Sequence, residues 1–425
     1  MKFSIFSIGD LLSFRGAFRL DNSQPYGISS LDYAIGTMAF HPTRNSLFIA
    51  GHDHHRAIAE YSVMEDLDFY DQDSNNNPHP SVQDLPVTPP PLQAFVYAFE
   101  GLDNRHDINR ITGMMVVDDV LFVNAENWYD ASLDEWTVTR DTSLYFPMAS
   151  NLSAAAPVGF FQLEGGSQAA GYMGRIPSPL QPLFNDSKFF TGWSSVYSIL
   201  SRYSQGPSLW TFEPQEMIER ENGSSSIMDR KENSTIIAAT PYMNYPYSHN
   251  DPSKWLSERA TEWVEPEDHQ PTGNLSAPPA DPLWNPLSEA RYAFFVQDEI
   301  FCVIGITAGL ESGIGYKVIQ ENGHECGGPC PFVSDDWYNY YWLYHVQEIV
   351  NASFVWDPRP FAYGVWELPY YVTVPSEHRI IGGTVDEERG ILFVALANAG
   401  KLDEYDQPPL ILMFDILEAN QTKAR

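Results

Sequence analysis

The sequence predicts an all-β fold on the basis of three observations. First, 14% of the 425 residues are aromatic and the chain holds 32 prolines and 28 glycines, which favours many short strands joined by irregular loops. Second, apolar runs of about four to eight residues recur between turn-forming residues, as strands require. Third, no window carries a long apolar stripe with the helical period. With 43% hydrophobic residues, the chain can bury a large core, as one all-β unit or as two domains.

The stretch from residue 36 to residue 63 shows the strand pattern most clearly. A short apolar run at 37–40 meets a turn around Pro42, and a second run at 46–50 leads into the polar cluster HDHHR at 52–56. A third run at 57–63 carries the chain away from this cluster. Three apolar runs separated by turn residues predict a β-meander.

The same pattern returns along the chain. The runs before residue 20 end in GAFRL, which we expect to pair with a late element. Residues 64–92 and 251–290 are rich in proline and polar residues, so we expect them to be surface loop insertions. Further strand units are predicted at residues 93–102, 111–132, 189–214, 290–305, 335–345 and 379–400, with hairpin turns at 118–119, 297–299 and 386–390.

These repeated units resemble the blades of a β-propeller. LFIAGH, LFVNAE and LFVALA correspond to second strands of blades, and AEYSV, LWTFEP and LILMFDI to outer strands. The resemblance, which extends to uncharacterised bacterial propeller proteins, implies one propeller domain over residues 1–425 with about seven four-stranded blades. A β-sandwich followed by a second β domain is the alternative.

The charge balance limits the classes of partner. The chain has 24 Lys and Arg against 56 Asp and Glu, a net charge of −32. Such a surface repels the phosphates of nucleic acid and of anionic membranes, so we expect no nucleic-acid partner and no membrane insertion. We interpret the acidic surface as a solvated one that resists aggregation. The alternative is that it binds cations. Oligomeric state stays open.

The sequence also does not decide the cellular compartment of the protein or whether its cysteines form a disulfide. The first residues carry no recognisable signal peptide or membrane span, whereas seven N-x-S/T sequons indicate an extracellular protein. Cys326 and Cys330 bracket a Gly-Gly-Pro turn and can form a local disulfide. A zinc site on these two cysteines and His324 is the alternative.

A propeller would bring the loops that follow the second strands to one face. Loops held on a rigid scaffold are where binding and catalysis concentrate, so the site candidates come mainly from these loops. The catalytic candidates are His54, His55, Arg56, Tyr129, Arg202 and Tyr203. The ligand-binding candidates are Glu126, Trp128, Asp130, Tyr316, Trp337, Tyr405 and Asp406.

Two segments are candidates for binding a divalent cation, either calcium or zinc. If the strand continues through His52 and His54, both imidazoles lie on one side and offer a metal platform. The alternative is a hydrogen-bonded histidine turn. Asp71, Asp73 and Asn75 alternate as at the start of a calcium loop, but the sixth and twelfth positions lack the usual Gly and Glu.

Two functions fit these candidates. The preferred one is a non-enzymatic propeller that binds a glycan or a protein partner through its loop-rich face, since aromatic loops are present and no complete catalytic motif is. The alternative is a carbohydrate-active enzyme, a polysaccharide lyase or a glycoside hydrolase, that uses His, Tyr and Arg side chains on that face. A protein of net charge −32 repels acidic glycans unless the face is locally basic.

Overall fold

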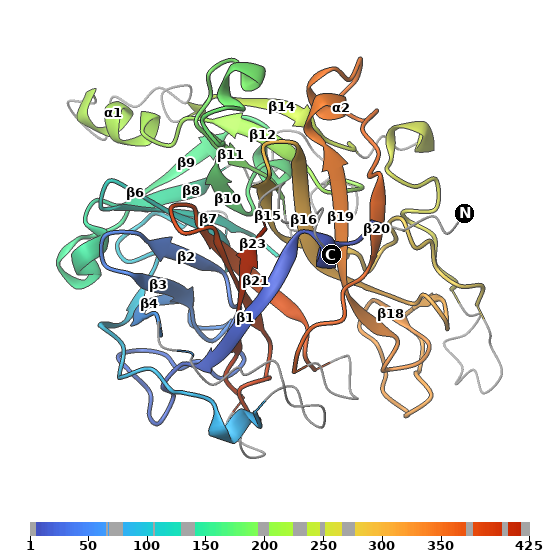
Figure 1. Ribbon diagram of the computed structural model, residues 1–425, viewed down its shortest axis with the longest axis horizontal. Helices are drawn as coiled ribbons and strands as arrows, with labels where there is room; N and C mark the ends of the chain where they lie inside the picture. Colours follow the sequence, from blue (N-terminus) through green and yellow to red (C-terminus); the bar gives the residue numbers. More distant parts are fainter. Residues whose placement is uncertain are drawn as a thin grey trace.

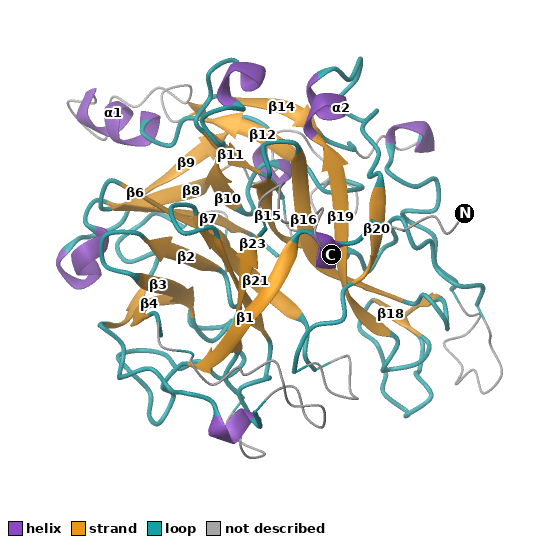
Figure 2. Cartoon of the chain, in the orientation of Figure 1, coloured by secondary structure: helices purple, strands orange, loops and turns teal. Residues whose placement is uncertain are grey.

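The computed structural model describes residues 6–64, 67, 80–104, 107–128, 141–193, 204–223, 236–246, 251–265, 277–370, 377–401 and 407–417. Five antiparallel sheets follow one another around the molecule, each with four strands in its main meander (Figure 1). The helices are short, and α1 (Glu216–Gly223) and α2 (Val346–Val350) lie at the outer edge of the view (Figure 2). This arrangement is a β-propeller, as the sequence pattern predicts.

The five blades take their strands in chain order. Blade 1 holds β2 (Met38–His41), β3 (Ser46–Ala50), β4 (Ala57–Ser62) and β5 (Gln93–Tyr97). Blade 2 holds β6 (Arg110–Val117), β7 (Val120–Glu126), β8 (Asp141–Phe146) and β9 (Val158–Leu163), with β13 (Ile236–Ile237) added in parallel to β9. Blade 3 holds β10 (Met173–Arg175), β11 (Phe189–Thr191), β12 (Leu209–Phe212) and β14 (Ala239–Met243). Blade 4 holds β15 (Glu289–Val296), β16 (Ile300–Ala308), β19 (Trp337–His345) and β20 (Ala362–Val365). Blade 5 holds β21 (Ile380–Asp386), β22 (Ile391–Leu396), β23 (Leu410–Ile416) and β1 (Leu12–Arg19).

The first and last parts of the chain close the ring together. The N-terminal strand β1 is the outermost strand of blade 5 and pairs antiparallel with β23 from Leu12↔Ile416 to Arg19↔Leu410. The expectation that GAFRL pairs with a late element is therefore confirmed. The innermost strands β2, β6, β10, β15 and β21 contact one another in that order, and β21 returns to β2. A closed ring protects most sheet edges from pairing with other chains.

Two details of the sequence-based expectation are wrong. The propeller has five blades, not about seven, because long connections take up much of the chain, such as residues 310–336 and 346–361 in blade 4. The segments AEYSV, LWTFEP and LILMFDI are third strands (β4, β12 and β23), and β5, β14 and β1 lie outside them. LFIA, LFVNAE and LFVAL are second strands, as predicted.

The apolar core lies between neighbouring blades. Successive side chains of a strand point to opposite faces, so Met38 and Phe40 pack towards blade 5 while Ala39 packs towards blade 2. Similar clusters join blade 2 to blade 3, and blades 3, 4 and 5 to one another. Strands buried on both faces read as nearly continuous apolar runs, which explains why these segments resemble one another in sequence.

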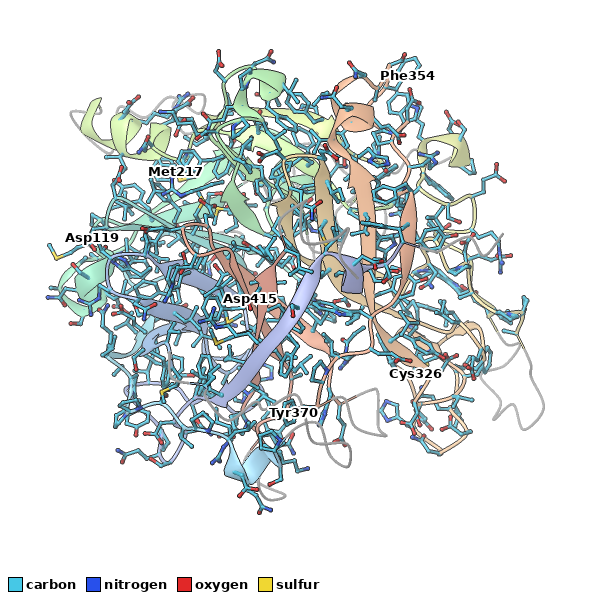
Figure 3. The ribbon with its side chains drawn as sticks, in the orientation of Figure 1. Asp119, Met217, Cys326, Phe354, Tyr370 and Asp415 are labelled. Atoms are coloured by element: carbon cyan, nitrogen blue, oxygen red, sulfur yellow. A yellow bond between two sulfur atoms is a disulfide. The ribbon has the colours of Figure 1, made fainter. Side chains whose placement is uncertain are left out.

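The connections carry the remaining elements. The helices are α1 (Glu216–Gly223) and α2 (Val346–Val350), and short 3-10 segments occupy Ile8–Asp10, Val82–Asp84, Ala149–Ala154, Gly166–Gln168, Gln181–Phe184 and Pro252–Lys254. Within the connection from β16 to β19, β17 (Ile314–Tyr316) pairs with β18 (Pro329–Pro331). Cys326, labelled in Figure 3, forms a disulfide with Cys330 beside this hairpin. Of the two arrangements that the sequence allows for these cysteines, the disulfide is the one present.

Candidate functional site

The two ends of the propeller differ in what they present. At one end, which we call the loop face, the innermost strands begin and the second strands end, so loops such as 51–56 and 309–336 emerge there. At the opposite end, the turn face, tight hairpin turns at 42–45, 118–119, 297–299 and 387–390 join first to second strands. The connections from second to third strands therefore gather at the loop face, whereas the turn face carries these tight turns and the connections that follow third strands.

Three β-bulges shape the centre of the loop face. The ladders of β6, β15 and β21 with their second strands each skip one residue, and these residues are Thr112, Arg291 and Ile381. A bulge turns an extra side chain away from the regular ladder. All three residues line a small opening on the propeller axis, together with Thr37, Arg110, Ile111 and Glu126. We call this opening the axial mouth.

Glycines allow the innermost strands to approach closely below the axial mouth. A Cβ on Gly113 would overlap the backbone carbonyl of Gly171 in the next blade, and one on Gly382 would overlap the carbonyl of Gly36. Because only glycine lacks a Cβ, both positions require it. The two glycines directly follow the bulged residues Thr112 and Ile381, so close packing and bulge occur at the same level of the axis.

Glu126 is the most unusual group in the axial mouth. It is the last residue of β7 and is only 2% exposed, and neither carboxylate oxygen has a hydrogen bond of full geometry from the described residues. Burial raises the pKa of Glu126 to about 7, and Glu289 adds to this effect. Arg110, Arg291 and a weak contact from the Trp193 indole oppose the rise. The carboxyl is therefore poised to change its protonation near neutral pH.

Arg110 links Glu126 to the surface of the loop face. Its Nη2 donates a hydrogen bond to Asp53 Oδ2 at 3.2 Å, which joins blade 2 to the 51–56 loop of blade 1. Its guanidinium lies 5.7 Å from the ring centre of Trp128, a cation–π contact. The pKa of Arg110 is raised by Asp53 and Glu126 against the effect of burial, so the side chain stays charged.

The histidine cluster occupies a turn beside Arg110. Strand β3 ends at Ala50, so the strand does not continue through His52 and His54 as the metal hypothesis assumed. The ring of His52 stacks on that of His55 at 4.5 Å, and its Nδ1 accepts a hydrogen bond from the His54 backbone at 3.2 Å. Burial, His55 and His54 together lower the pKa of His52. These contacts form a hydrogen-bonded histidine turn.

Further contacts fix this turn to its surroundings. Ser29 Oγ lies 3.0 Å from His55 Nδ1, and Arg56 Nε donates to the Asn109 carbonyl at 3.3 Å. Asn109 in turn accepts a hydrogen bond from the backbone of Trp128 at 2.9 Å. The hydrogen bonds made by Asn109 therefore hold the 51–56 loop against the end of β7.

Exposed rings surround this network. Tyr33 is 56% exposed, and its ring lies edge-on to His52 at 5.9 Å. His54 and His55 are exposed, and Trp128 is half-buried. The loop face thus presents flat rings beside the charged pair of Arg110 and Asp53.

The remaining predicted residues fall into two groups. Tyr316 stacks on Trp263 at 5.5 Å, and Trp337 lies under the guanidinium of Arg379 at 4.7 Å; no contact within the described ranges joins either to the histidine turn. The others lie outside the described residues: Tyr129, Asp130, Arg202, Tyr203, Tyr405, Asp406, Asp71, Asp73 and Asn75.

Two findings concern metals and membranes. Among the residues that the structure describes, no group of three or more His, Cys, Asp and Glu side chains is arranged to hold a metal ion. Within the same residues, no helix has the length and apolar character needed to cross a bilayer.

Sequence reasoning missed several residues of the axial mouth. Arg110 and Arg291 line the mouth and Glu289 acts on Glu126 from beside it, but all three lie at or near the start of apolar runs that by themselves predict only strands. A charged residue at the start of an otherwise apolar run, as in RITGMMVV and EARYAFFV, is the signal that could have revealed them. Asp53 and Tyr33 do not lie at the start of an apolar run, so the sequence gives no such signal for them.

The chain matches no protein-family model and no curated protein. Among solved structures it is similar to the PQQ-bound aldose sugar dehydrogenase from Streptomyces coelicolor, with a TM-score of 0.35 and 10% identity over 95% of this chain and 98% of that one. It is also similar to Chaetomium thermophilum Raptor, with a TM-score of 0.29 and 9% identity over 96% of this chain but only 30% of that one.

Proposed function

We propose that this protein is a non-enzymatic binding module that holds a neutral glycan on its loop face. The observation that supports the proposal is the chain of contacts that sets exposed or half-buried rings, Tyr33 and Trp128, on either side of the Asp53–Arg110 pair. Sugars stack on flat aromatic faces and hydrogen-bond through their hydroxyls. Aromatic rings beside a carboxylate and a guanidinium offer both kinds of contact.

The charge of the protein favours a neutral sugar chain over an acidic one. Arg110 is already engaged by Asp53 and by the Trp128 ring, and Arg291 is paired with Glu289. The whole chain carries a net charge of −32, which repels polyanions at long range. A neutral oligosaccharide avoids this repulsion.

An array of neutral and uronate-containing glycans tests the proposal. We expect neutral glycans to bind, and both Trp128→Ala and Tyr33→Asn to weaken binding of a hit about tenfold, the loss of roughly one stacking contact. Phe354→Asn is the matched control, because Phe354 is also 56% exposed and lies at the turn face beyond α2 (Figure 3). Binding of uronate glycans alone, or equal effects of Tyr33→Asn and Phe354→Asn, would contradict the proposal.

A second candidate, a carbohydrate-active enzyme, is favoured by the state of Glu126. A carboxyl with a pKa of about 7 is suited to act as a general base at neutral pH. The axial mouth has a volume of about 10 Å³, room for about one water molecule beside Glu126. In a hydrolase, Glu126 would activate this water as the general base.

In a lyase, His54, His55 and Arg56 would instead supply the base and the uronate contact, with a tyrosine as acid. Incubation of array hits separates these activities. New reducing ends that disappear in Glu126→Gln would support a hydrolase, and new absorbance from unsaturated ends that survives Glu126→Gln would support a lyase. If neither signal appears with any bound glycan, the enzymatic candidate is wrong.

A further inference from the structure

A second cavity lies at the turn face, on the propeller axis and at the opposite end from the axial mouth. Its volume is about 320 Å³, within the range of small-ligand pockets. All five innermost strands contribute to its wall, so the cavity is a product of the ring itself. The lining residues are Phe40, Pro42, Met114, Met115, Val116, Met173, Gly174, Arg175, Tyr292, Thr384, Val385, Asp386, Glu387 and Glu388.

The inner wall is apolar and polarisable. Met114, Met115 and Met173 are each less than one-tenth exposed, as are the rings of Phe40 and Tyr292. Thioethers and aromatic faces adapt their shape to a ligand and interact well with the faces and edges of rings and with cations. The wall therefore suits a compact apolar body.

The rim carries more negative than positive charge that is free to meet a ligand. Asp386 is occupied, since it pairs with Arg389 and accepts hydrogen bonds from two backbone N–H groups of its turn. Glu387 forms an ion pair with Arg175 at 3.6 Å and accepts a hydrogen bond from the Arg175 backbone, whereas Glu388 has no ion pair with any described residue. Both glutamates are exposed at the opening of the cavity.

Arg175 is itself held by other groups. Its Nη2 donates to the carbonyl of Val116 at 3.4 Å, and its guanidinium lies 5.1 Å from the ring centre of Phe189. Burial and Asp386 raise the pKa of Glu387 to about 7, although Arg175 opposes the rise. Above pH 7, where Glu387 is ionised, two carboxylates at this rim therefore share the single positive charge of Arg175.

We propose that the turn-face cavity binds a small organic cation, with its apolar body against the methionine-lined wall and its ammonium group at Glu387 and Glu388. The cavity size, the thioether and aromatic wall and the two glutamates that share one arginine at the rim each point to this class of ligand. The site lies at the opposite end of the axis from the axial mouth and shares no lining residue with it, and a small cavity between the two shares residues with both.

Methionine-methyl NMR with benzylammonium as the probe tests this site. We expect the methyl signals of Met114, Met115 and Met173 to shift on titration, while that of the exposed Met148, which does not line the cavity, stays in place. Benzyl alcohol and benzoate are the neutral and anionic analogues of the probe. They should bind at least about tenfold more weakly, because they leave the two glutamates unpaired.

Variants at the rim make the test specific. Glu387→Gln should weaken benzylammonium binding about tenfold without affecting folding, because Glu387 is an exposed turn residue. Glu100→Gln, at an exposed turn of blade 1, is the matched control and should leave the affinity unchanged. Equal affinities for benzylammonium and benzyl alcohol, no shift of the three lining methionines, or an unchanged affinity in Glu387→Gln would each overturn the proposal.

Discussion

Arg110 and Asp53 connect two blades across the loop face, through the 3.2 Å hydrogen bond from the guanidinium of blade 2 to the loop carboxylate of blade 1. The same guanidinium is the strongest of the groups that keep the pKa of buried Glu126 from rising further. One side chain therefore links the exposed part of the candidate site to its buried carboxyl. The protonation of Glu126 and the geometry of the histidine turn depend on a common partner.

The first prediction concerns the pH dependence of stability. The pKa of Glu126 is about 7 in the folded chain against an ordinary value of 4.5, so between these values the folded state holds a proton that the unfolded state has lost. The free energy of unfolding should therefore fall as the pH rises from 4.5 to 7, by up to roughly 3 kcal/mol from this group. Above pH 7 this contribution levels off.

Glu126→Gln isolates the effect in urea unfolding at pH 5, 6, 7 and 8. In the variant, the free energy of unfolding should fall less steeply with pH. The variant should therefore become more stable relative to the natural chain as the pH rises. Glu258→Gln, at an exposed position, should keep the slope of the natural protein. Identical slopes in the natural chain and Glu126→Gln would show that the carboxyl does not titrate in this window.

The second prediction concerns the close approach of blades 2 and 3. Gly113→Ala would place a methyl group on the carbonyl oxygen of Gly171, a backbone atom that cannot turn aside. We expect a loss of at least about 2 kcal/mol in the free energy of unfolding. Gly327→Ala is the control, since a Cβ at Gly327 meets nothing within 4 Å. Denaturant midpoints that coincide for the two variants would be inconsistent with this packing.

The third prediction concerns the disulfide beside β17 and β18. Replacing Cys326 and Cys330 by serine opens a short loop, and the expected loss is at most about 2 kcal/mol. The effect should be local: amide exchange should accelerate at Lys317, which donates to the Gly328 carbonyl, and stay unchanged in β16. Faster exchange throughout blade 4 would instead mean that the disulfide supports the blade as a whole.

The fold was predictable in class and topology but not in blade number. LFIA, LFVNAE and LFVAL are buried on both faces, so their apolar runs identify second strands directly. Blade 3 breaks the pattern, because its innermost strand Met173–Arg175 has three residues inside a glycine-containing loop. Counting units in the sequence therefore cannot give the number of blades that close the ring.

The candidate site was predictable only in part, for a related physical reason. The HDHHR loop stands out because it is polar between two apolar strands. Arg291 is hidden in the sequence, because only the skipped register of β15 turns its side chain to the axis. Glu126 was a candidate as a loop residue, whereas its burial and raised pKa come from neighbours in two other blades.

The pairing of β1 with β23 has a consequence for how the protein is made. Arg15 and Asp415, which form an ion pair in this closure, are 400 residues apart in the chain. During synthesis, the first strand must wait without its partner until nearly the whole chain has left the ribosome. Contacts of such long sequence separation form slowly, and an unpaired strand can join a neighbouring chain. The ring can therefore close only after β23 has been made, about 400 residues after β1.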